Sequence, residues 1–296
     1  MNSTILVAGG TGNLGGRIVK ALIARGANVH VLVRESSDGT KKAGLEKMGA
    51  TLIHGDLNNL QDMTEACKGV SCVVSALAGL HDVIVGAQTV LLNAAVAAGV
   101  PRFIPSDYSS DFTTLPKGDN RNFDLRREFH LRLENANISA TSIFNGAFDY
   151  ILRYNTPLYD VKKNVVSYWG DSADWQLDFS TLDNVADFTA AAALDATTPR
   201  FLRIASFKVS PNDLVAMGTR HKKTAFKLVH MGSLTDFAAY IKRERAQHPE
   251  GETELYPRWQ SSQYMHSMFA TQSHSLNNDR YPDVKWATAQ QVITTI

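Results

Sequence analysis

Apolar and polar positions along the first 145 residues follow two alternating periods. Short β-branched runs have the period of strands, and the longer segments between them carry apolar residues at helical spacing. The run at 70–77 is apolar almost throughout, as in a strand buried in a parallel sheet. The predicted strands are 4–9, 28–34, 51–56, 70–77, 102–106 and 138–146, and the predicted helices are 13–26, 41–49, 60–69, 83–99 and 120–135. This alternation predicts an α/β, Rossmann-type doubly wound parallel sheet.

The pattern changes after residue 150, where a loop-rich segment concentrates aromatic side chains. Helices with serine N-caps are predicted to begin at Ser210 and Ser233. We expect a Rossmann domain at 1–150, with a returning segment near 178–206, and a smaller α+β domain formed mainly by 151–296. The other elements expected here are helices at 185–194 and 257–270 and a strand at 201–207.

Composition narrows the class of protein. Of the 296 residues, 44% are apolar and 20% are charged, as in a globular protein with a large core. The net charge of +1, from 30 basic and 29 acidic residues, gives no electrostatic case for nucleic acid or an acidic membrane as a partner. Cys67 and Cys72 are too few to staple the chain, which suggests a reducing compartment, and we expect both to be small core residues.

Targeting and metal motifs are missing from the sequence. No apolar run approaches the roughly 18 residues of a membrane span, and the first strand begins without a secretory leader pattern. No HExxH motif or Cys/His cluster occurs, so we expect no metal. These observations predict a cytoplasmic protein.

A glycine-rich turn joins the first predicted strand to the first predicted helix. Gly9, Gly12 and Gly15 have G-x-x-G-x-x-G spacing, with Thr11, Asn13 and Leu14 between them. Glycines at this junction permit a tight turn and a close approach of the backbone to a pyrophosphate, whose charge lies at the helix N-terminus. These six residues are therefore candidate cofactor contacts; the alternative is a merely structural turn.

The end of the second strand bears on the choice of cofactor. Arg34 stands there, 34 − 9 = 25 residues after Gly9, where NAD enzymes place an acid for the ribose 2′-hydroxyl. A guanidinium suits the 2′-phosphate of NADP, and Lys42 adds charge. Glu35 keeps the NAD reading open, and Arg34 could also only pair with Glu35 or solvent. We expect NADP(H).

Ligands of open α/β sheets bind outside the carboxyl ends of the strands. The residues at those ends are further candidate cofactor contacts: Asp56 and Leu57 after the third strand, Ser75, Ala76 and Leu77 after the fourth, and Pro105 and Ser106 after the fifth.

Several segments together resemble a known family. "VAGGTGNLGGRIVKAL", "VLVRE", "GDL", "AAVAAGVPRFIPSDY" and "RYPDVKW" are similar to the NmrA-like and isoflavone reductase-like branch of the atypical short-chain dehydrogenase/reductases. The resemblance implies NADP(H) binding and, in enzymatic members, hydride delivery to aromatic or quinone-like substrates. The family also includes NADP-sensing regulators. Asn145, Gly146 and Phe148 resemble its nicotinamide-flanking loop; Phe148 or Tyr150 would supply an aromatic wall, or would only pack in the core.

The segment "NFDLRREFH" departs from the reductases of this family. Counting back from Ile138, the position of their catalytic lysine falls at Arg126. An arginine, with a pKa above about 12, can anchor a cofactor or polarise a substrate but is a poor acid. His130 lies one helical turn further on and could donate a proton. Tyr108 is a rival donor.

Alternatives exist for each of these catalytic candidates. Glu128 and Arg132 form an i,i+4 pair, so part of this helix is an ordinary solvated face. His130 could be a satisfied surface or core histidine, and the Tyr108 hydroxyl could serve packing. Tyr159 and Lys163 match the Tyr-x-x-x-Lys spacing of short-chain dehydrogenases, but they follow the sixth strand, so we interpret the match as chance.

The sequence predicts an NADPH-dependent reductase of a small aromatic, phenolic (lignan- or isoflavonoid-like) or quinone or enone substrate. In this hypothesis the first domain binds cofactor and the second binds substrate. The competing hypothesis is a non-catalytic NADP(H)-sensing regulator of the NmrA type. A small aromatic substrate is the expected partner, with no nucleic acid and no membrane; a homodimer is compatible with the sequence.

Overall fold

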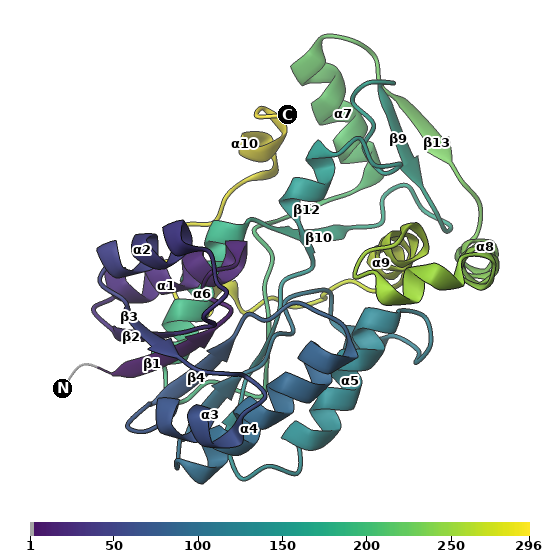
Figure 1. Cartoon of the computed structure of the whole chain (residues 1–296). Coiled ribbons are helices and arrows are strands. Elements are labelled where there is room, and N and C mark those ends of the chain that lie inside the picture. The colour runs from purple at the N-terminus through teal and green to yellow at the C-terminus, as the bar shows by residue number, and fades with distance from the viewer. Residues whose placement is uncertain (1–2) are drawn as a thin grey trace. The chain divides into compact units, whose positions relative to one another are not determined.

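The predicted parallel sheet is present in the computed structural model, which describes residues 3–296 (Figure 1). Its six strands have the order β3-β2-β1-β4-β5-β6, and every neighbouring pair is parallel. The order reverses beside β1, and in sheets of this type ligands bind outside the carboxyl ends of the strands at such a point. The strands are β1 (Thr4–Ala8), β2 (Asn28–Val33), β3 (Thr51–His54), β4 (Cys72–Ser75), β5 (Arg102–Ile104) and β6 (Ser139–Ala140).

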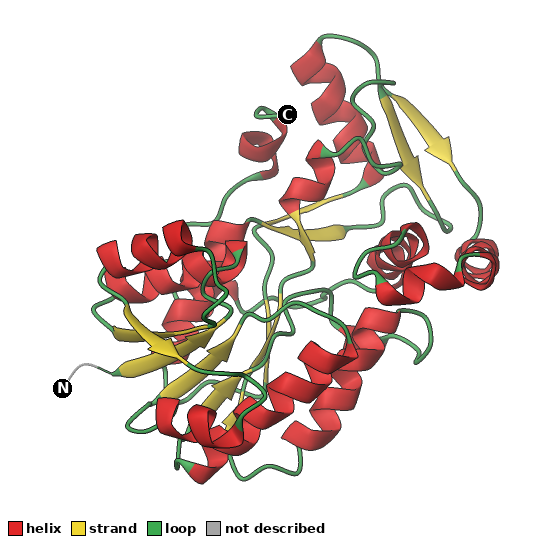
Figure 2. Cartoon of the chain, in the orientation of Figure 1, coloured by secondary structure: helices red, strands yellow, loops and turns green. Residues whose placement is uncertain are grey.

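Helices cover both faces of this sheet (Figures 1 and 2). One buried cluster lies on one face of the sheet. It joins the strand residues Leu6, Val73 and Phe103 to the helix residues Leu91 and Phe129. Cys67 and Cys72 are buried free thiols, as predicted, and burial raises the pKa of both to about 12. The helices are α1 (Asn13–Ala24), α2 (Gly39–Lys47), α3 (Leu60–Ala66), α4 (Gln88–Ala97), α5 (Arg121–Leu133) and α6 (Leu182–Leu194).

Two predicted elements are divided. The predicted helix 83–99 begins as a π-helix, η1 (Asp82–Ala87), before α4. The predicted strand 138–146 divides at Thr141 into β6 and β7 (Ser142–Phe144), because the Thr141 N–H still bonds to β5 whereas the Ser142 N–H bonds to the Arg200 carbonyl. The predicted strand 201–207 ends early as β11 (Phe201–Arg203), the partner of β7.

The described chain forms two compact units. The first comprises the chain up to Tyr108, Phe123–Ile143 and Val185–Leu202; the second comprises Ser109–Asn122, Phe144–Asn184 and Arg203–Ile296. Whether these units divide cofactor and substrate binding as predicted stays a prediction.

The second unit has its own core, in which Trp169, Phe179, Phe237 and Phe269 are buried. Ser210 and Ser233 cap α7 and α8 as predicted. Its strands are β8 (Ala147–Phe148), β9 (Val165–Tyr168), β10 (Leu177–Ser180), β12 (Phe207–Val209) and β13 (Lys227–His230). Its helices are α7 (Pro211–Lys222), α8 (Leu234–Gln247), α9 (Arg258–Ala270) and α10 (Ala289–Ile293), with short 3₁₀ segments η2 (Phe112–Thr114), η3 (Asp149–Arg153), η4 (Pro249–Thr253) and η5 (Asn278–Arg280).

Gly15 is the position at which the fold tolerates a side chain least. A Cβ there would lie 2.1 Å from the carbonyl oxygen of Gly9. We expect Gly15→Ala to lower the free energy of unfolding by about 1–3 kcal/mol through overpacking. Gly44→Ala is the matched control, because its Cβ meets nothing within 4 Å on an exposed turn of α2; it should raise that free energy by about 0.5–1 kcal/mol. Urea unfolding measures both, and equal stability of the two variants would contradict the tight turn.

Candidate functional site

The glycine-rich turn has the geometry of an anion-binding loop. Gly9 has φ +83°, and a Cβ there would lie 2.5 Å from the carbonyl oxygen of Ala76, so the turn touches the loop after β4. Gly12 is the N-cap of α1 and offers no side chain to the first N–H groups of the helix. Thr11, Asn13 and Leu14 flank it at partly or fully exposed positions. The Gly12 N–H donates to the Gly9 carbonyl at 2.9 Å, so the phosphate donors expected here are the N–H groups of the first turn of α1, which no side chain caps.

Arg34 lies exposed after β2, beside a small group of polar side chains. Its N–H donates to Ser37 Oγ at 3.1 Å, which fixes the backbone at the strand end. Lys42 Nζ donates to the carbonyl oxygen of Glu35 at 3.3 Å, so it lies beside Arg34. The Glu35 carboxylate is 3.5 Å from His54 Nδ1. Glu35, the acid that kept the NAD interpretation open, therefore has a neighbour on β3.

Asp56 has a local structural role after β3. Its carboxylate accepts the N–H of Asn58 at 2.9 Å, and its own N–H donates to Asp62 at 3.1 Å. These bonds shape the turn that leads into α3. Leu57 is half-buried and packs against the core of the first unit. Both residues stay candidate cofactor contacts.

Ser106 joins the loop after β5 to three other segments. Its N–H donates to Gln88 Oε1 at 3.0 Å, its hydroxyl donates to the Leu77 carbonyl at 2.7 Å, and its carbonyl accepts from Arg126 Nε at 3.0 Å. Ala76 and Leu77 thereby connect Ser106 with the glycine-rich turn. The candidates at the ends of β1, β4 and β5 are thus brought together in the first unit, including the fully buried Ser75 and the adjoining Pro105.

The basic side chains of α5 contact different groups. Arg126 is held by the Ser106 carbonyl, whereas Arg127 pairs with Asp124 at 2.7 Å. Arg132 pairs with Glu128 at 2.9 Å, as the spacing predicts, and His81 also contacts that carboxylate. One face of the helix therefore fixes the β5 loop, and the other is solvated.

His130 belongs to a buried polar network. Its Nε2 lies 2.7 Å from Asp107 Oδ2, and their side chains are 7% and 0% exposed. Ser142 Oγ donates to the same carboxylate oxygen at 2.6 Å, and Arg200 Nη1 donates to Ser142 Oγ at 2.6 Å. The burial favours the alternative that His130 is a satisfied core histidine.

The charge of Asp107 depends on this network. Burial alone would raise the pKa of its carboxyl, but the facing His130, the hydrogen bonds from His130 and Ser142 and the nearby Arg126 together hold that pKa below its usual value. Asp107 is therefore ionised at neutral pH. Such a buried carboxylate is stable only while the groups that stabilise its charge stay in place.

Tyr108 is nearly buried, with 8% of its surface exposed. Burial, with smaller effects of Cys72 and Asp107, raises the pKa of its phenol above the usual value. Tyr108 therefore keeps its proton at physiological pH. This environment suits the packing alternative.

Asn145 and Phe148, the loop candidates, lie in the second unit. Asn145 is fully buried, and its N–H donates to the Ser109 carbonyl at 2.9 Å. Phe148 stacks on Tyr150 with ring centres 5.7 Å apart and planes 9° apart. Burial, followed by the neighbouring tyrosines, raises the pKa of Tyr150 to about 12. This stacked pair has the aromatic surface that the predicted wall requires.

The Tyr159–Lys163 spacing forms no dyad. Tyr159 is fully buried and stacks on Phe226, whereas Lys163 is exposed and lies 3.4 Å from Asp160. The interpretation of a chance match is confirmed.

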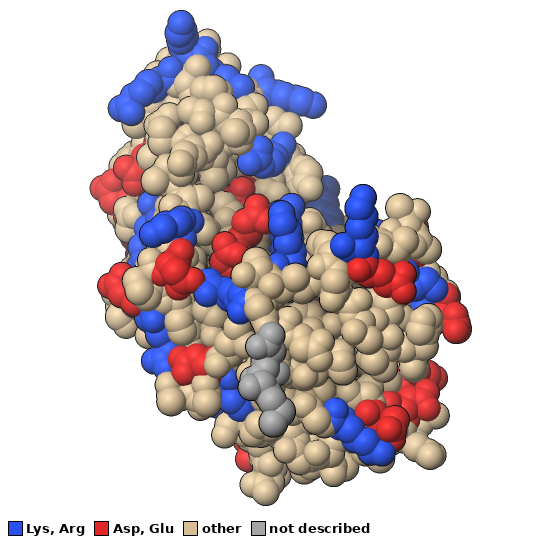
Figure 3. All heavy atoms as spheres, turned by 90° about the vertical axis from the view of Figure 1, so that its left-hand side faces the viewer, with Lys and Arg blue, Asp and Glu red and all other residues tan. Residues whose placement is uncertain are grey.

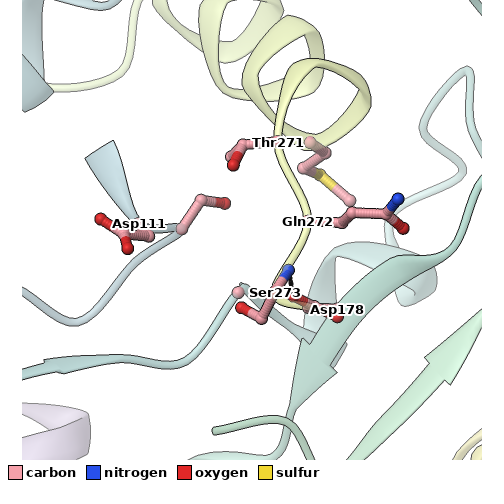
Figure 4. A pocket seen from close by; sticks show the side chains of 8 residues that line it. Asp111, Asp178, Thr271, Gln272 and Ser273 are labelled. Atoms are coloured by element: carbon pink, nitrogen blue, oxygen red, sulfur yellow. Dashed lines mark hydrogen bonds between the residues drawn. The ribbon is translucent and has the colours of Figure 1, made fainter. Parts of the chain in front are cut away.

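The second unit contains a small polar cavity (Figure 4). Its volume of about 10 Å³ matches roughly one water molecule. It is therefore too small for an organic ligand. The cavity is lined by Ser110, Asp111, Gly146, Asp178, Met268, Thr271, Gln272 and Ser273.

Among the described residues, neither the surface charge nor the arrangement of possible metal ligands indicates a further site. On the face in Figure 3, basic and acidic side chains are interspersed over much of the surface, and basic side chains gather at its upper end. Within residues 3–296, no group of three or more His, Cys, Asp or Glu side chains could hold a metal ion. In the same part of the chain, no helix has the length and apolar character needed to cross a membrane.

Sequence reasoning missed Gln88, Asp107, Ser142 and Arg200. One feature of the sequence could have indicated Gln88: its amide stands within a mostly apolar helical segment. The other three become visible as a set only when the ends of β5, β7 and β11 meet.

The strand order and the glycine-rich turn define a Rossmann-type dinucleotide-binding fold. The chain belongs to the NmrA-like family, whose model matches residues 1–239. It is 28% identical over 305 residues to pinoresinol reductase 2 of Arabidopsis thaliana, covering 95% of this chain and 93% of that protein.

Solved structures resemble the chain over its whole length. The structure of AtPrR2 with NADP+ and (+)-pinoresinol has a TM-score of 0.77 and 25% identity, covering 100% of this chain and 99% of the other. Isoflavone reductase has a TM-score of 0.82 at 20% identity, with the same coverage, which shows the fold alone. The family and fold expected from the sequence are therefore confirmed.

Removing His130 should destabilise the fold far more than removing a solvated neighbour on α5. His130→Ala leaves Asp107 without its main partner, so we expect a loss of about 3–5 kcal/mol at pH 7. Arg132→Ala removes a partly exposed pair with Glu128 and a hydrogen bond to the Glu128 carbonyl, and should cost less than about 1 kcal/mol. Denaturant unfolding checks both, and similar losses would contradict the dependence of buried Asp107 on His130.

The same pair predicts a pH dependence. Because the pKa of Asp107 is depressed in the folded protein, its contribution to stability is present above its ordinary value of 3.8 and is lost as the pH falls below it. In His130→Ala, burial should instead raise that pKa. The stability difference between the two proteins should therefore shrink from pH 7 to pH 4, and a constant difference would contradict this.

Proposed function

We propose that the protein is an NADPH-dependent reductase that transfers hydride to a small phenolic substrate of the lignan class or a related aromatic or quinone-like compound. The observation that carries the proposal is the pairing of an uncapped α1 N-terminus with a cation, Arg34, at the end of β2. Similarity to pinoresinol reductase 2 and to the AtPrR2 complex supports both cofactor and substrate class.

The residues of the first unit would hold NADP(H) along its length. The turn Gly9–Gly15 would receive the pyrophosphate, and Arg34 with Lys42 would bind the 2′-phosphate. Bound NADPH supplies the hydride. The second unit, with Phe148 and Tyr150, would supply aromatic surface for the substrate.

Arg126 would act as a hydrogen-bond donor and not as an acid. Its Nε is directed to the Ser106 carbonyl, which fixes the orientation of the guanidinium. Its positive charge would stabilise negative charge that develops on a substrate oxygen. Since His130 and Tyr108 are buried, we propose that the proton comes from water or from a substrate hydroxyl.

A non-catalytic NADP(H)-sensing regulator is the second candidate. The arginine at the position of the reductase lysine, held by a backbone carbonyl, favours it. In that case the cofactor site would be unchanged and turnover would be absent.

The cofactor proposal is tested at Arg34. Arg34→Ala should weaken NADPH binding about 10- to 100-fold through the loss of charge-assisted hydrogen bonds, with NADH affinity unchanged. Lys47→Ala, at the exposed end of α2, is the matched control and should alter neither. Fluorescence titration measures both cofactors. An unchanged preference for NADPH in Arg34→Ala would refute the assignment.

Turnover distinguishes the two candidate functions. NADPH oxidation should be observed with at least one class among lignans, isoflavonoids, enones and quinones. We expect Arg126→Ala to lower kcat roughly 10²-fold, as for the loss of one donor to a developing oxyanion, and to leave NADPH affinity within a few fold. Tight NADPH binding without turnover on any of these classes would exclude the reductase and leave the sensor.

A further inference from the structure

Gln88 is a buried amide at the junction of η1 and α4, with no role so far in the proposed function. Its side chain is 0% exposed. Its Oε1 accepts the Ser106 N–H at 3.0 Å, and its Nε2 donates to the Ile84 carbonyl at 3.0 Å. The two ends of one amide therefore hold backbone groups of two different segments.

The π-helical turn before Gln88 is part of this arrangement. Such turns are rare and occur frequently at functional sites, because they change which side chains a helix presents. The turn also packs tightly, since a Cβ on Gly79 would lie 2.5 Å from Val83 Cβ. The loop after β4 is therefore fixed at its far end by η1 and at its near end by the glycine-rich turn.

Ser106 transmits the position of Gln88 to the loop after β4. The Ser106 hydroxyl donates to the Leu77 carbonyl at 2.7 Å. The preceding residue, Ala76, directly faces Gly9, where even one added carbon would lie 2.5 Å from its carbonyl oxygen. A shift of Ser106 would therefore move Leu77 and with it the loop after β4. It would also move the carbonyl that holds Arg126 Nε.

A buried neutral hydrogen bond adds little net stability, because the same groups bond to water in the unfolded chain. A hydrogen bond is directional, however, so it holds the two groups that it joins in a defined orientation. Ligand sites depend on supporting hydrogen bonds of this kind. The arrangement around Gln88 acts on the ends of β4 and β5. The end of β2, with Arg34, lies outside this path of hydrogen bonds.

We propose that Gln88 is a positioning residue of the dinucleotide site. By holding Ser106, it keeps the loops after β4 and β5 in register and so orients the nicotinamide half of NADP(H). The adenine half depends on Arg34 and is independent of Gln88. This inference rests on the proposed NADP(H) function.

The test compares two ligands that share the adenine half. NADPH reports on the whole site, whereas 2′,5′-ADP carries adenine and the 2′-phosphate but no nicotinamide. Gln88→Met keeps the side-chain length and removes both hydrogen bonds. We expect it to weaken NADPH binding about tenfold, the loss of roughly one or two hydrogen bonds, and to leave 2′,5′-ADP binding within about twofold.

Thr89→Val is the matched control on the same helix. It removes the hydroxyl that donates to the Val85 carbonyl but has no link to Ser106. It should leave both affinities unchanged. Gln88→Glu keeps an oxygen that can accept the Ser106 N–H and should retain more NADPH affinity than Gln88→Met.

Each outcome decides the matter. Parallel weakening of both ligands in Gln88→Met would make Gln88 merely structural, and unchanged NADPH binding would remove its role altogether; either result overturns the proposal. If Gln88→Met does not fold, Gln88→Glu carries the same comparison, and loss of both ligands there counts against it. A wild-type protein that binds no NADPH would instead reject the proposed function, which is a separate and earlier result.

Discussion

A carboxylate without exposed surface requires cations and hydrogen-bond donors around it, and Asp107 imposes this constraint on the first unit. His130 meets it from α5, Ser142 from β7, and Arg200 through Ser142 from the residue before β11. These elements are far apart in the sequence, so the carboxylate fixes where they converge. Because Asp107 follows Ser106, the same network holds the loop after β5 in place.

That loop links structural support to the proposed chemistry. Ser106 places all three of its polar groups on other segments, and one of them is the guanidinium of Arg126. The sequence predicts that Arg126 stands where the reductases of this family carry a lysine. Arg126 is a candidate ligand contact, and its hydrogen bond to the Ser106 carbonyl also holds the loop after β5. A substitution of Arg126 would therefore remove a positive charge and also release the Ser106 carbonyl that it holds.

The sequence predicted the elements whose signals are local. The glycine-rich turn and the serine caps of α7 and α8 depend on neighbouring residues, and each lies where the pattern placed it. Several strands end earlier than predicted, among them β3 at His54 and β4 at Ser75. The division at Thr141 was not predictable, since it depends on bonds to distant backbone groups. The π-helical start of α4 was not predicted either. His130 illustrates the limit most clearly. Its helical position was evident, but its burial against Asp107 follows from the meeting of three chain segments.

The outer edges of the six-stranded sheet also limit how the protein can associate. β6 has two residues and β3 has four, so neither offers a long row of open backbone groups to a strand from another molecule. A protein built this way is protected from edge-to-edge aggregation by the brevity of its outermost strands. If two copies associate through the first unit, a continuous intermolecular sheet at these two edges would be an unfavourable route.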